Sequence, residues 1–355
     1  MKLLYITNGI KGGGGLERVL SIKASYFAEE WGYDVSIVTL NESKGDSFYH
    51  FSPRIHTYNI ITPNNKLKYL ISYCQGIQQI VNKVNPDIIS VCDDGLKGLF
   101  IPLWLKYKKT SIIYERHASI KLNNSVWQEK LMNIGGNLYK KLIVLTHYNL
   151  TEWKCKNLQV IPNPLSFIPE ESSTLNKKQI ICVGALSYNK GYDLLIKAWH
   201  KIASDYPDWH ISIFGRGDSK EYMKIIRELH LEKQIHFRGA QKNILPHYLD
   251  SSILVLPSRS EGFGMVLIEA MSCGLPCIAF DCPCGPRDII ENGVDGFLVP
   301  PLDIGKLAYC IKALIDNPTL RKEMGEKAKR NVMRYNISNV ALQWKKLFQD
   351  ITIKN

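Results

Sequence analysis

The sequence contains no apolar segment long enough to cross a lipid bilayer. The longest nearly apolar run covers residues 98–105 and contains Pro102, whereas a transmembrane helix needs about 20 apolar residues. The first ten residues also lack the basic start and the cleavage site of a secretory signal peptide. We therefore expect a cytoplasmic protein, or one attached to the cytosolic face of a membrane.

The sequence also lacks a disulfide framework and a recognisable metal motif. Its nine cysteines are odd in number and scattered through apolar segments, which favours a reducing compartment. Cys282 and Cys284 stand too close together for a zinc knuckle and have no second pair. Asp93 and Asp94 are adjacent, and no Asp-x-Asp motif occurs in a metal-binding setting. We therefore predict neither a metal site nor a cofactor.

Length and composition are those of a globular protein with two domains. The chain has 355 residues, 45% of them apolar and 22% charged, without a low-complexity tract. Its net charge is +12, and residues 1–165 carry 20 Lys and Arg against 12 Asp and Glu. A basic first half fits an anionic membrane surface, a nucleic acid or a phosphorylated substrate, or simply solvated lysines. We find no contiguous basic and aromatic motif that would favour nucleic acid.

Strand and helix patterns alternate along the whole chain, which predicts an α/β fold of parallel sheets covered on both faces. The polar stretch that follows residues 159–164 is typical of a linker, so the domain boundary is placed near residue 165. We predict domains at residues 1–165 and 166–336, followed by a C-terminal helix within residues 337–355. Strands are expected at residues 2–7, 34–40, 88–92, 111–114, 141–146, 179–183, 210–214, 235–239, 253–256 and 277–280, and helices include 66–84, 96–106 and 265–271.

The stretch PSRSEGFGMVLIEAMSCG, residues 257–274, is the most informative part of the chain. It combines the end of a strand, a glycine turn and a helix start, where unpaired N–H groups attract anions, so a phosphate is expected at residues 262–266. Glu261 and Glu269 flank that turn, and an ionised carboxylate accepts hydrogen bonds from the vicinal hydroxyls of a sugar or ribose. The pattern therefore indicates a nucleotide-sugar site, the alternative being an ordinary strand-turn-helix with solvated acids.

This block resembles the donor site of retaining glycosyltransferases with the GT-B fold, most closely glycosyltransferase family 4, the group 1 glycosyltransferases. The resemblance implies two Rossmann-like domains with parallel sheets facing across a cleft and a C-terminal helix that returns to the first domain. It implies catalytic roles for Glu261, His117 and Lys190. Donor contacts are carried over to Gly13, Gly14, Gly184, Lys190, Arg238, Phe263, Gly264, Met265, Val266 and Glu269.

The segment at residues 184–191 departs from the family pattern at one position. In the family, an arginine and a lysine of this segment neutralise the diphosphate leaving group. Lys190 matches the lysine, but Ala185 stands where the arginine would be. The second cationic contact is therefore open between Arg259, Arg116 and Arg238.

Taken with these features, the resemblance implies a metal-independent, retaining hexosyltransferase that uses a nucleoside-diphosphate sugar, with a UDP-hexose favoured. The predicted acceptor is a saccharide or lipid-linked saccharide in surface polysaccharide, lipopolysaccharide or glycan biosynthesis, and nucleic acid is not expected as a partner. Peripheral contact with an anionic inner membrane surface is assigned to Lys66, Lys68, Lys106, Lys108 and Lys109. Alternatives are a nucleotide-sugar epimerase or phosphorylase-like protein on the same architecture, or a non-catalytic binding module.

Overall fold

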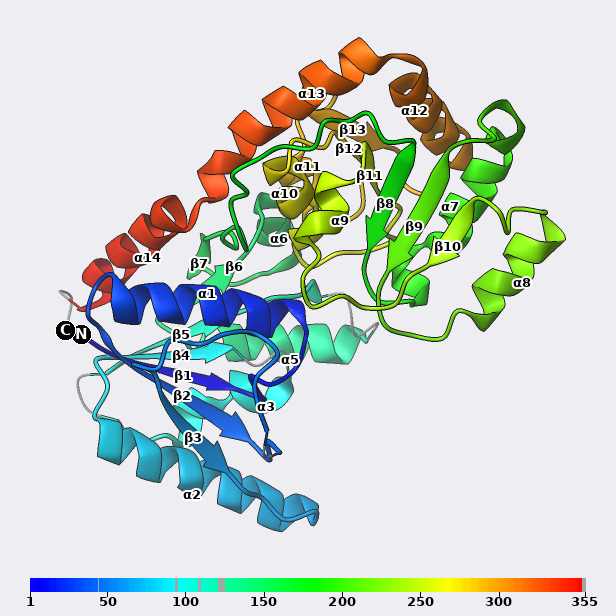
Figure 1. Cartoon of the computed structure of the whole chain (residues 1–355). Coiled ribbons are helices and arrows are strands. Elements are labelled where there is room, and N and C mark those ends of the chain that lie inside the picture. Colours follow the sequence, from blue (N-terminus) through cyan, green and yellow to red (C-terminus); the bar gives the residue numbers. More distant parts are fainter. Residues whose placement is uncertain (44, 93–94, 108–109, 121–124, 353–355) are drawn as a thin grey trace. The chain divides into compact units, whose positions relative to one another are not determined.

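The structure, a computed structural model, describes residues 1–43, 45–92, 95–107, 110–120 and 125–352. Its chain divides into two compact units (Figure 1). The first combines residues 1–166 with 336–355, and the second comprises residues 167–335. The predicted boundaries, at residues 165 and 336, each lie one residue from these divisions. None of the helices in the described ranges combines the length and apolar composition that a membrane crossing requires.

The first unit contains a seven-stranded parallel sheet with the strand order β3-β2-β1-β4-β5-β6-β7. The prediction of an α/β unit with a parallel sheet is therefore confirmed. Its strands are β1 (Lys2–Thr7), β2 (Asp34–Leu40), β3 (His56–Ile60), β4 (Ile88–Cys92), β5 (Ser111–Glu115), β6 (Lys141–Val144) and β7 (Leu158–Val160). Its helices are α1 (Gly15–Glu29), α2 (Lys66–Val84), α3 (Leu96–Leu99), α4 (Ile101–Trp104), α5 (Val126–Gly136), α6 (His147–Glu152) and α14 (Ile337–Thr352).

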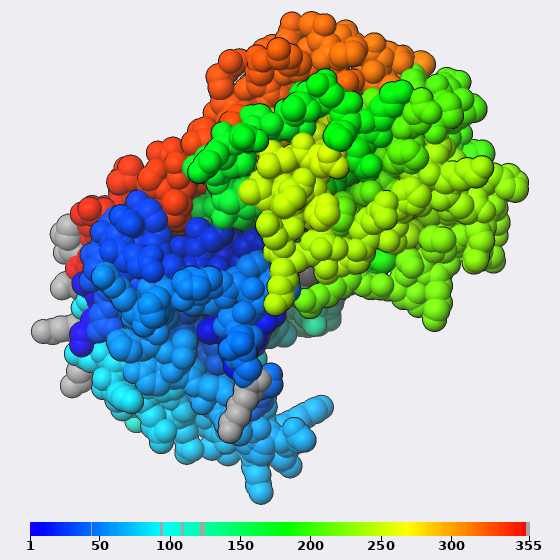
Figure 2. Space-filling view, in the orientation of Figure 1, coloured from blue at the N-terminus to red at the C-terminus, as the bar shows by residue number. Residues whose placement is uncertain are grey.

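Two hydrophobic cores cover the two faces of this sheet. Helices α1 and α14 supply one core, in which Phe27 packs edge-on against Phe348, with ring centroids 5.8 Å apart. Helices α2 and α5 supply the other core. In the space-filling view the red residues of α14 lie against the blue N-terminal part of this unit (Figure 2). The last helix of the chain therefore completes the core of the first unit.

One predicted helix is divided in two by proline. The helix expected over residues 96–106 is observed as α3 and α4, with Phe100 between them. Pro102 has no N–H group to donate to the carbonyl of Gly98, and the hydroxyl of Tyr139 donates to that carbonyl instead. The strand predicted over residues 141–146 also ends early, because Thr146 is the N-cap of α6.

The second unit contains a six-stranded parallel sheet with the order β10-β9-β8-β11-β12-β13, which is the Rossmann pattern seen in the first unit. Its strands are β8 (Gln179–Val183), β9 (His210–Phe214), β10 (Ile235–Phe237), β11 (Ile253–Leu256), β12 (Cys277–Phe280) and β13 (Gly296–Val299). Its α-helices are α7 (Tyr192–His200), α8 (Lys220–Glu228), α9 (Leu245–Leu249), α10 (Met265–Ser272), α11 (Pro286–Ile289), α12 (Ile304–Asp316) and α13 (Pro318–Asn331). Short 3-10 helices are η2 (Tyr188–Lys190), η3 (Ala203–Asp205) and η4 (Val332–Tyr335).

Candidate functional site

The candidate site in the second unit lies where the strand order reverses. Strands β8 and β11 are neighbours, and the strands that follow them, β9 and β12, lie toward opposite edges of the sheet. Ligands of open α/β sheets bind beyond the carboxyl ends of strands at such a point. Gly184 follows β8 and Pro257 follows β11. The segments 184–191 and 257–266, which carry most of the predicted donor contacts, therefore start at the same place in the sheet.

Lys190 and Glu261 form an ion pair at this position. Lys190 Nζ lies 2.6 Å from Glu261 Oε1, and Ser258 Oγ donates to the same oxygen at 2.6 Å. The two charged side chains are 22% and 8% exposed. A Cβ atom on Gly184 would stand 3.0 Å from Lys190 Cε, so the lysine side chain lies against this glycine. Gly184, Lys190 and Glu261 are therefore brought together.

The turn before α10 presents backbone N–H groups that no side chain caps. Gly264 is the N-cap, with φ +95°, and it has no side chain to cap the first N–H groups of the helix. Met265 and Val266, which carry those groups, are half-buried. A Cβ on Gly285 would stand 2.0 Å from the carbonyl oxygen of Phe263. These amide groups at the positive end of the helix dipole suit a phosphate, as the sequence predicts.

Phe263 and Glu269 are more enclosed than their predicted roles suggest. The Phe263 ring is buried and packs edge-on against Tyr335, so it is the backbone of this residue that remains for a ligand. Glu269, on α10, is fully buried, and Tyr248 Oη donates to its Oε2 at 3.0 Å. A ribose bound to Glu269 would have to share the carboxylate with Tyr248.

The three candidates for the missing arginine have different surroundings. Arg259 forms a two-pronged ion pair with Asp193, with N–O distances of 2.8 and 2.7 Å. Burial acts to raise the pKa of Asp193, but the hydrogen bonds from Arg259 outweigh it and the pKa is lowered. Arg116 is buried in the first unit and donates to the carbonyls of Ala118 and Ser119. Arg238 is exposed just beyond the end of β10.

His117 lies in a buried polar cluster of the first unit. Its side chain is 7% exposed, and its Nε2 is 3.4 Å from Glu115 Oε2. Glu115 ends β5 and also accepts a hydrogen bond from the ammonium group of Lys23, on α1. Burial acts to raise the pKa of Glu115, but Lys23 and His117 outweigh it and lower the pKa to about 2. The carboxylate is therefore ionised at neutral pH.

This cluster also contains the ligand types of a metal site. Cys92, Glu115 and His117 offer ligand atoms that all lie within 4.8 Å of one another. Burial raises the pKa of the Cys92 thiol well above its ordinary value, and the ammonium of Lys23 already occupies the carboxylate. A protonated thiol and a bound ammonium do not fit a divalent cation.

The glycine loop after β1 is held by polar side chains. Tyr49 Oη donates to the carbonyl of Gly13 at 3.1 Å. Gly14 is the N-cap of α1, and a Cβ there would stand 2.5 Å from a carboxylate oxygen of Glu17 in the first turn. Negative charge is already present at this helix start. This end of α1 therefore suits hydroxyl groups better than a phosphate.

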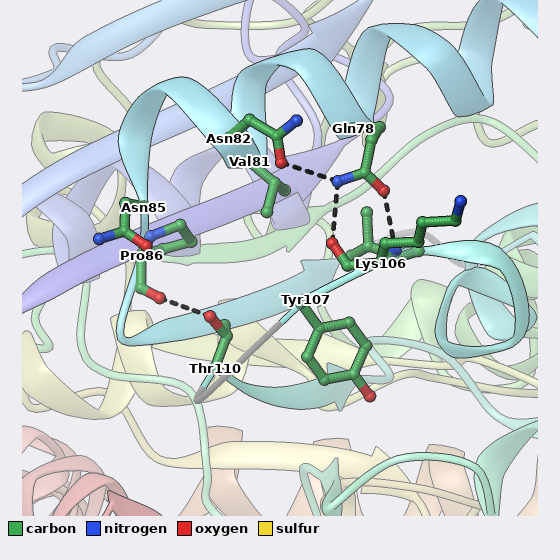
Figure 3. A pocket seen from close by; sticks show the side chains of 9 residues that line it. Gln78, Val81, Asn82, Asn85, Pro86, Lys106, Tyr107 and Thr110 are labelled. Atoms are coloured by element: carbon green, nitrogen blue, oxygen red, sulfur yellow. Dashed lines mark hydrogen bonds between the residues drawn. The ribbon is translucent and has the colours of Figure 1, made fainter.

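A pocket in the first unit lies at the amino ends of two central strands of its sheet, β4 and β5 (Figure 3). Its lining includes Pro86 and Thr110, which precede β4 and β5, and Thr110 Oγ1 donates to the carbonyl of Pro86 at 2.8 Å. On another wall, the side-chain amide of Gln78 bonds both the N–H and the carbonyl of Lys106, each at 2.8 Å. Because it lies at the amino ends of the strands, this pocket is not where a Rossmann-like sheet binds its ligand.

Sequence reasoning missed three residues that hold the candidate site residues in place. Ser258 donates a hydrogen bond to Glu261, Tyr248 donates one to Glu269, and Lys23 forms an ion pair with Glu115. Ser258 lies inside the motif of residues 257–274 and could have been noticed. Tyr248 and Lys23 stand 21 and 92 residues from their partners, and no local pattern marks them.

Comparison with known proteins gives this geometry a family context. Residues 166–331 match the family model described as Glycosyl transferases group 1. The chain is 29% identical over 368 residues to an uncharacterized glycosyltransferase of Haemophilus influenzae, an alignment that covers 97% of this chain and 99% of that protein. It is also 29% identical to the amylovoran biosynthesis glycosyltransferase AmsD of Erwinia amylovora, over 97% of this chain and 98% of AmsD.

Among solved structures, the chain is similar to a variant of TarM from S. aureus in complex with Fondaparinux, α-GlcNAc-glycerol and UDP. The TM-score is 0.82 at 18% sequence identity, and the match covers 98% of this chain and 99% of TarM. At this identity the likeness concerns the fold, which is GT-B. The match to the group 1 glycosyl transferases therefore lies in the second unit, and the chain has the GT-B fold.

Proposed function

We propose that this protein is a retaining hexosyltransferase that takes its sugar from a UDP-hexose. The observation that carries the proposal is the pairing of Lys190 with Glu261, 2.6 Å apart, beside a helix start that Gly264 leaves uncapped. A lysine and several free amide groups can together hold two phosphoryl groups. The UDP bound to TarM supports the choice of base.

In this proposal, Lys190 and the start of α10 stabilise the negative charge that develops on the leaving diphosphate. The bond between C1 of the hexose and the phosphate oxygen breaks. The acceptor oxygen bonds C1 on the same face of the sugar, and the acceptor proton passes to the departing phosphate. Glu261 accepts hydrogen bonds from the hexose hydroxyls, and Glu269, together with Tyr248, accepts them from the ribose.

The remaining contacts of the proposed reaction rest on the family resemblance. His117 is assigned to the donor hexose, and Gly13 and Gly14 are assigned to the donor from the first unit. Arg238 is favoured as the second cation, because Arg259 is held by Asp193 and Arg116 by the backbone of its own loop. We propose that no metal ion takes part, since Lys190 and the amide groups of α10 supply the positive charge.

The proposed acceptor is a saccharide or lipid-linked saccharide of a surface polysaccharide or lipopolysaccharide. The role of AmsD in amylovoran biosynthesis supports this class. The first half of α2 exposes Leu67, Leu70 and Ile71 among Lys66 and Lys68, a mixture that suits an anionic membrane surface. Lys106 is also exposed, whereas Lys108 and Lys109 lie outside the described residues.

A screen of nucleotide sugars by thermal shift, followed by turnover, tests this function. We expect UDP-hexoses to raise the melting temperature more than GDP-mannose does. Release of UDP should require an acceptor, persist in EDTA, and give a product whose anomeric configuration matches the donor, as read by NMR. Inversion at C1, or interconversion of donor sugars without an acceptor, would contradict the proposal. Failure to sediment with anionic vesicles at low salt would remove the membrane contact alone.

A further inference from the structure

A buried ion pair in the first unit has no role in the reaction as described so far. Lys23 and Glu115 are each 2% exposed, and the lysine ammonium donates to Glu115 Oε2. Ser90 Oγ donates to the other carboxylate oxygen at 2.5 Å. The same ammonium lies 4.1 Å from the ring centroid of Trp344, on α14. This cluster therefore links the core beneath α1 and α14 to the end of β5.

A buried ion pair usually stabilises a protein no more than apolar residues of similar size would. Desolvation of two charges is expensive, and apolar residues of similar size often give an equal or more stable protein. The titratable groups that face Glu115 are Lys23, His117, Tyr5 and Cys92. Burial raises the pKa of both Tyr5 and Cys92, so these two stay neutral at pH 7. The cluster thus places the carboxylate of Glu115 beside the imidazole of His117.

We propose that Glu115, paired with Lys23, is a positioning residue that fixes the imidazole ring of His117. Glu115 Oε2 lies 3.4 Å from His117 Nε2, and we expect its negative charge to favour the ring orientation and tautomer in which Nε2 carries a proton. The inference rests on the proposed function, in which His117 contacts the donor hexose. Lys23 acts one step further away, and Trp344 holds Lys23 through its ring face.

Glu115→Gln keeps the shape of the side chain but removes its charge, and it is the main test. We expect kcat to fall about 10- to 100-fold, which is what a small misplacement of a reacting group costs. The affinity for UDP, measured by thermal shift, should stay within about twofold, because the diphosphate is assigned to the second unit. The ring nitrogen NMR signals of His117 should change from one tautomer to a mixture.

Asp34→Asn is the matched control. Asp34 Oδ1 and His56 Nε2 form another carboxylate–histidine pair of the first unit, 3.9 Å apart, but they are 46% and 67% exposed. This control should leave kcat unchanged. Should Glu115→Gln fail to fold, Ser90→Ala removes only one hydrogen bond to the carboxylate, and we expect it to lower kcat about threefold.

His117→Ala separates the two proposals. If it lowers kcat while Glu115→Gln and Ser90→Ala both leave kcat and the ring signals unchanged, Glu115 does not position His117 and the inference is overturned. If His117→Ala itself leaves turnover unchanged, the assignment of His117 to the donor fails first, and the inference fails with it.

Discussion

The ion pair between Lys190 and Glu261 leads to a set of predictions that separate the stability of the protein from its affinity for UDP. In the free protein the lysine is held by a carboxylate that would repel the diphosphate. Lys190→Ala should weaken UDP binding about 10- to 100-fold, since a hydrogen bond to a charged group contributes roughly 1.5–3 kcal/mol. Turnover should fall about 100- to 1000-fold, which is the cost of one lost contact to developing charge.

Lys190→Ala should also reduce stability. It leaves Glu261, which is 8% exposed, with the hydroxyl of Ser258 as its remaining partner among the contacts described. An unpaired buried group costs about 1–3 kcal/mol, and each kcal/mol lowers the melting temperature of a domain of this size by about 2–4 °C. Glu261→Gln, in contrast, frees Lys190 from its carboxylate, so UDP should bind as tightly as in the wild type or a few-fold more tightly.

The double variant Lys190→Ala, Glu261→Gln distinguishes two roles of Lys190, stabilising the fold through its ion pair and binding the phosphates of UDP. It should recover part of the lost stability, measured by calorimetry, but none of the lost UDP affinity, measured by titration calorimetry. Lys178→Ala is the control, because Lys178 and Asp208 form an exposed pair 2.9 Å apart, which contributes about 0–1 kcal/mol. Unchanged UDP affinity after loss of Lys190, in both backgrounds, would refute the reasoning.

Three further predictions concern the folded chain. Gly191→Ala should lower the melting temperature sharply or prevent folding, because its Cβ would stand 1.9 Å from the carbonyl oxygen of Pro257. Gly239→Ala is the control: Gly239 has a similar positive φ but open space around it, so this substitution should cost only about 1 kcal/mol of stability. Urea unfolding at several pH values should show that ionised Glu115 stabilises the protein above its ordinary pKa of 4.5, and that on the order of 3 kcal/mol is lost as the pH falls toward its folded pKa of about 2. Glu115→Gln should remove this contribution and so reduce the loss of stability in acid, although other carboxyl groups such as Asp193 still titrate. An identical pH dependence of the wild type and the variant would contradict the prediction. A thiol reagent should label Cys74 first in the native protein, because the other eight cysteines are buried, and it should label all nine after unfolding. Fast labelling of several thiols in the native protein would contradict the burial of these eight side chains.

Much of the fold could be predicted because strands and helices of a parallel sheet leave strong local patterns. The helix over residues 66–84 and the strands 2–7, 34–40 and 88–92 have the predicted bounds. Strand β3 was missed, since His56–Ile60 lies at the sheet edge and is largely exposed, so it has no apolar run. The break between α3 and α4 is due to Pro102, and the carbonyl that this proline leaves without a helical donor accepts from Tyr139, which is 41 residues away.

The candidate site could be predicted in part for the same reason. Gly184, Lys190 and Glu261 stand within short motifs, and the structure brings them together. The motifs do not show how the acids are held, because Tyr248 and Lys23 reach them only through the tertiary fold. Nor could they show that Glu17 brings a carboxylate to the glycine loop, since this depends on the loop conformation.

The position of α14 determines when the first unit can finish folding. Trp344 and Phe348 belong to the core beneath α1, yet residues 167–335 are synthesised before them. A nascent chain that ends at residue 166 has its strands and α1 but lacks the apolar side chains of α14, so the part of the core that α14 covers stays exposed to chaperones until translation reaches the last helix. The second unit has no such delay, because it is one continuous segment.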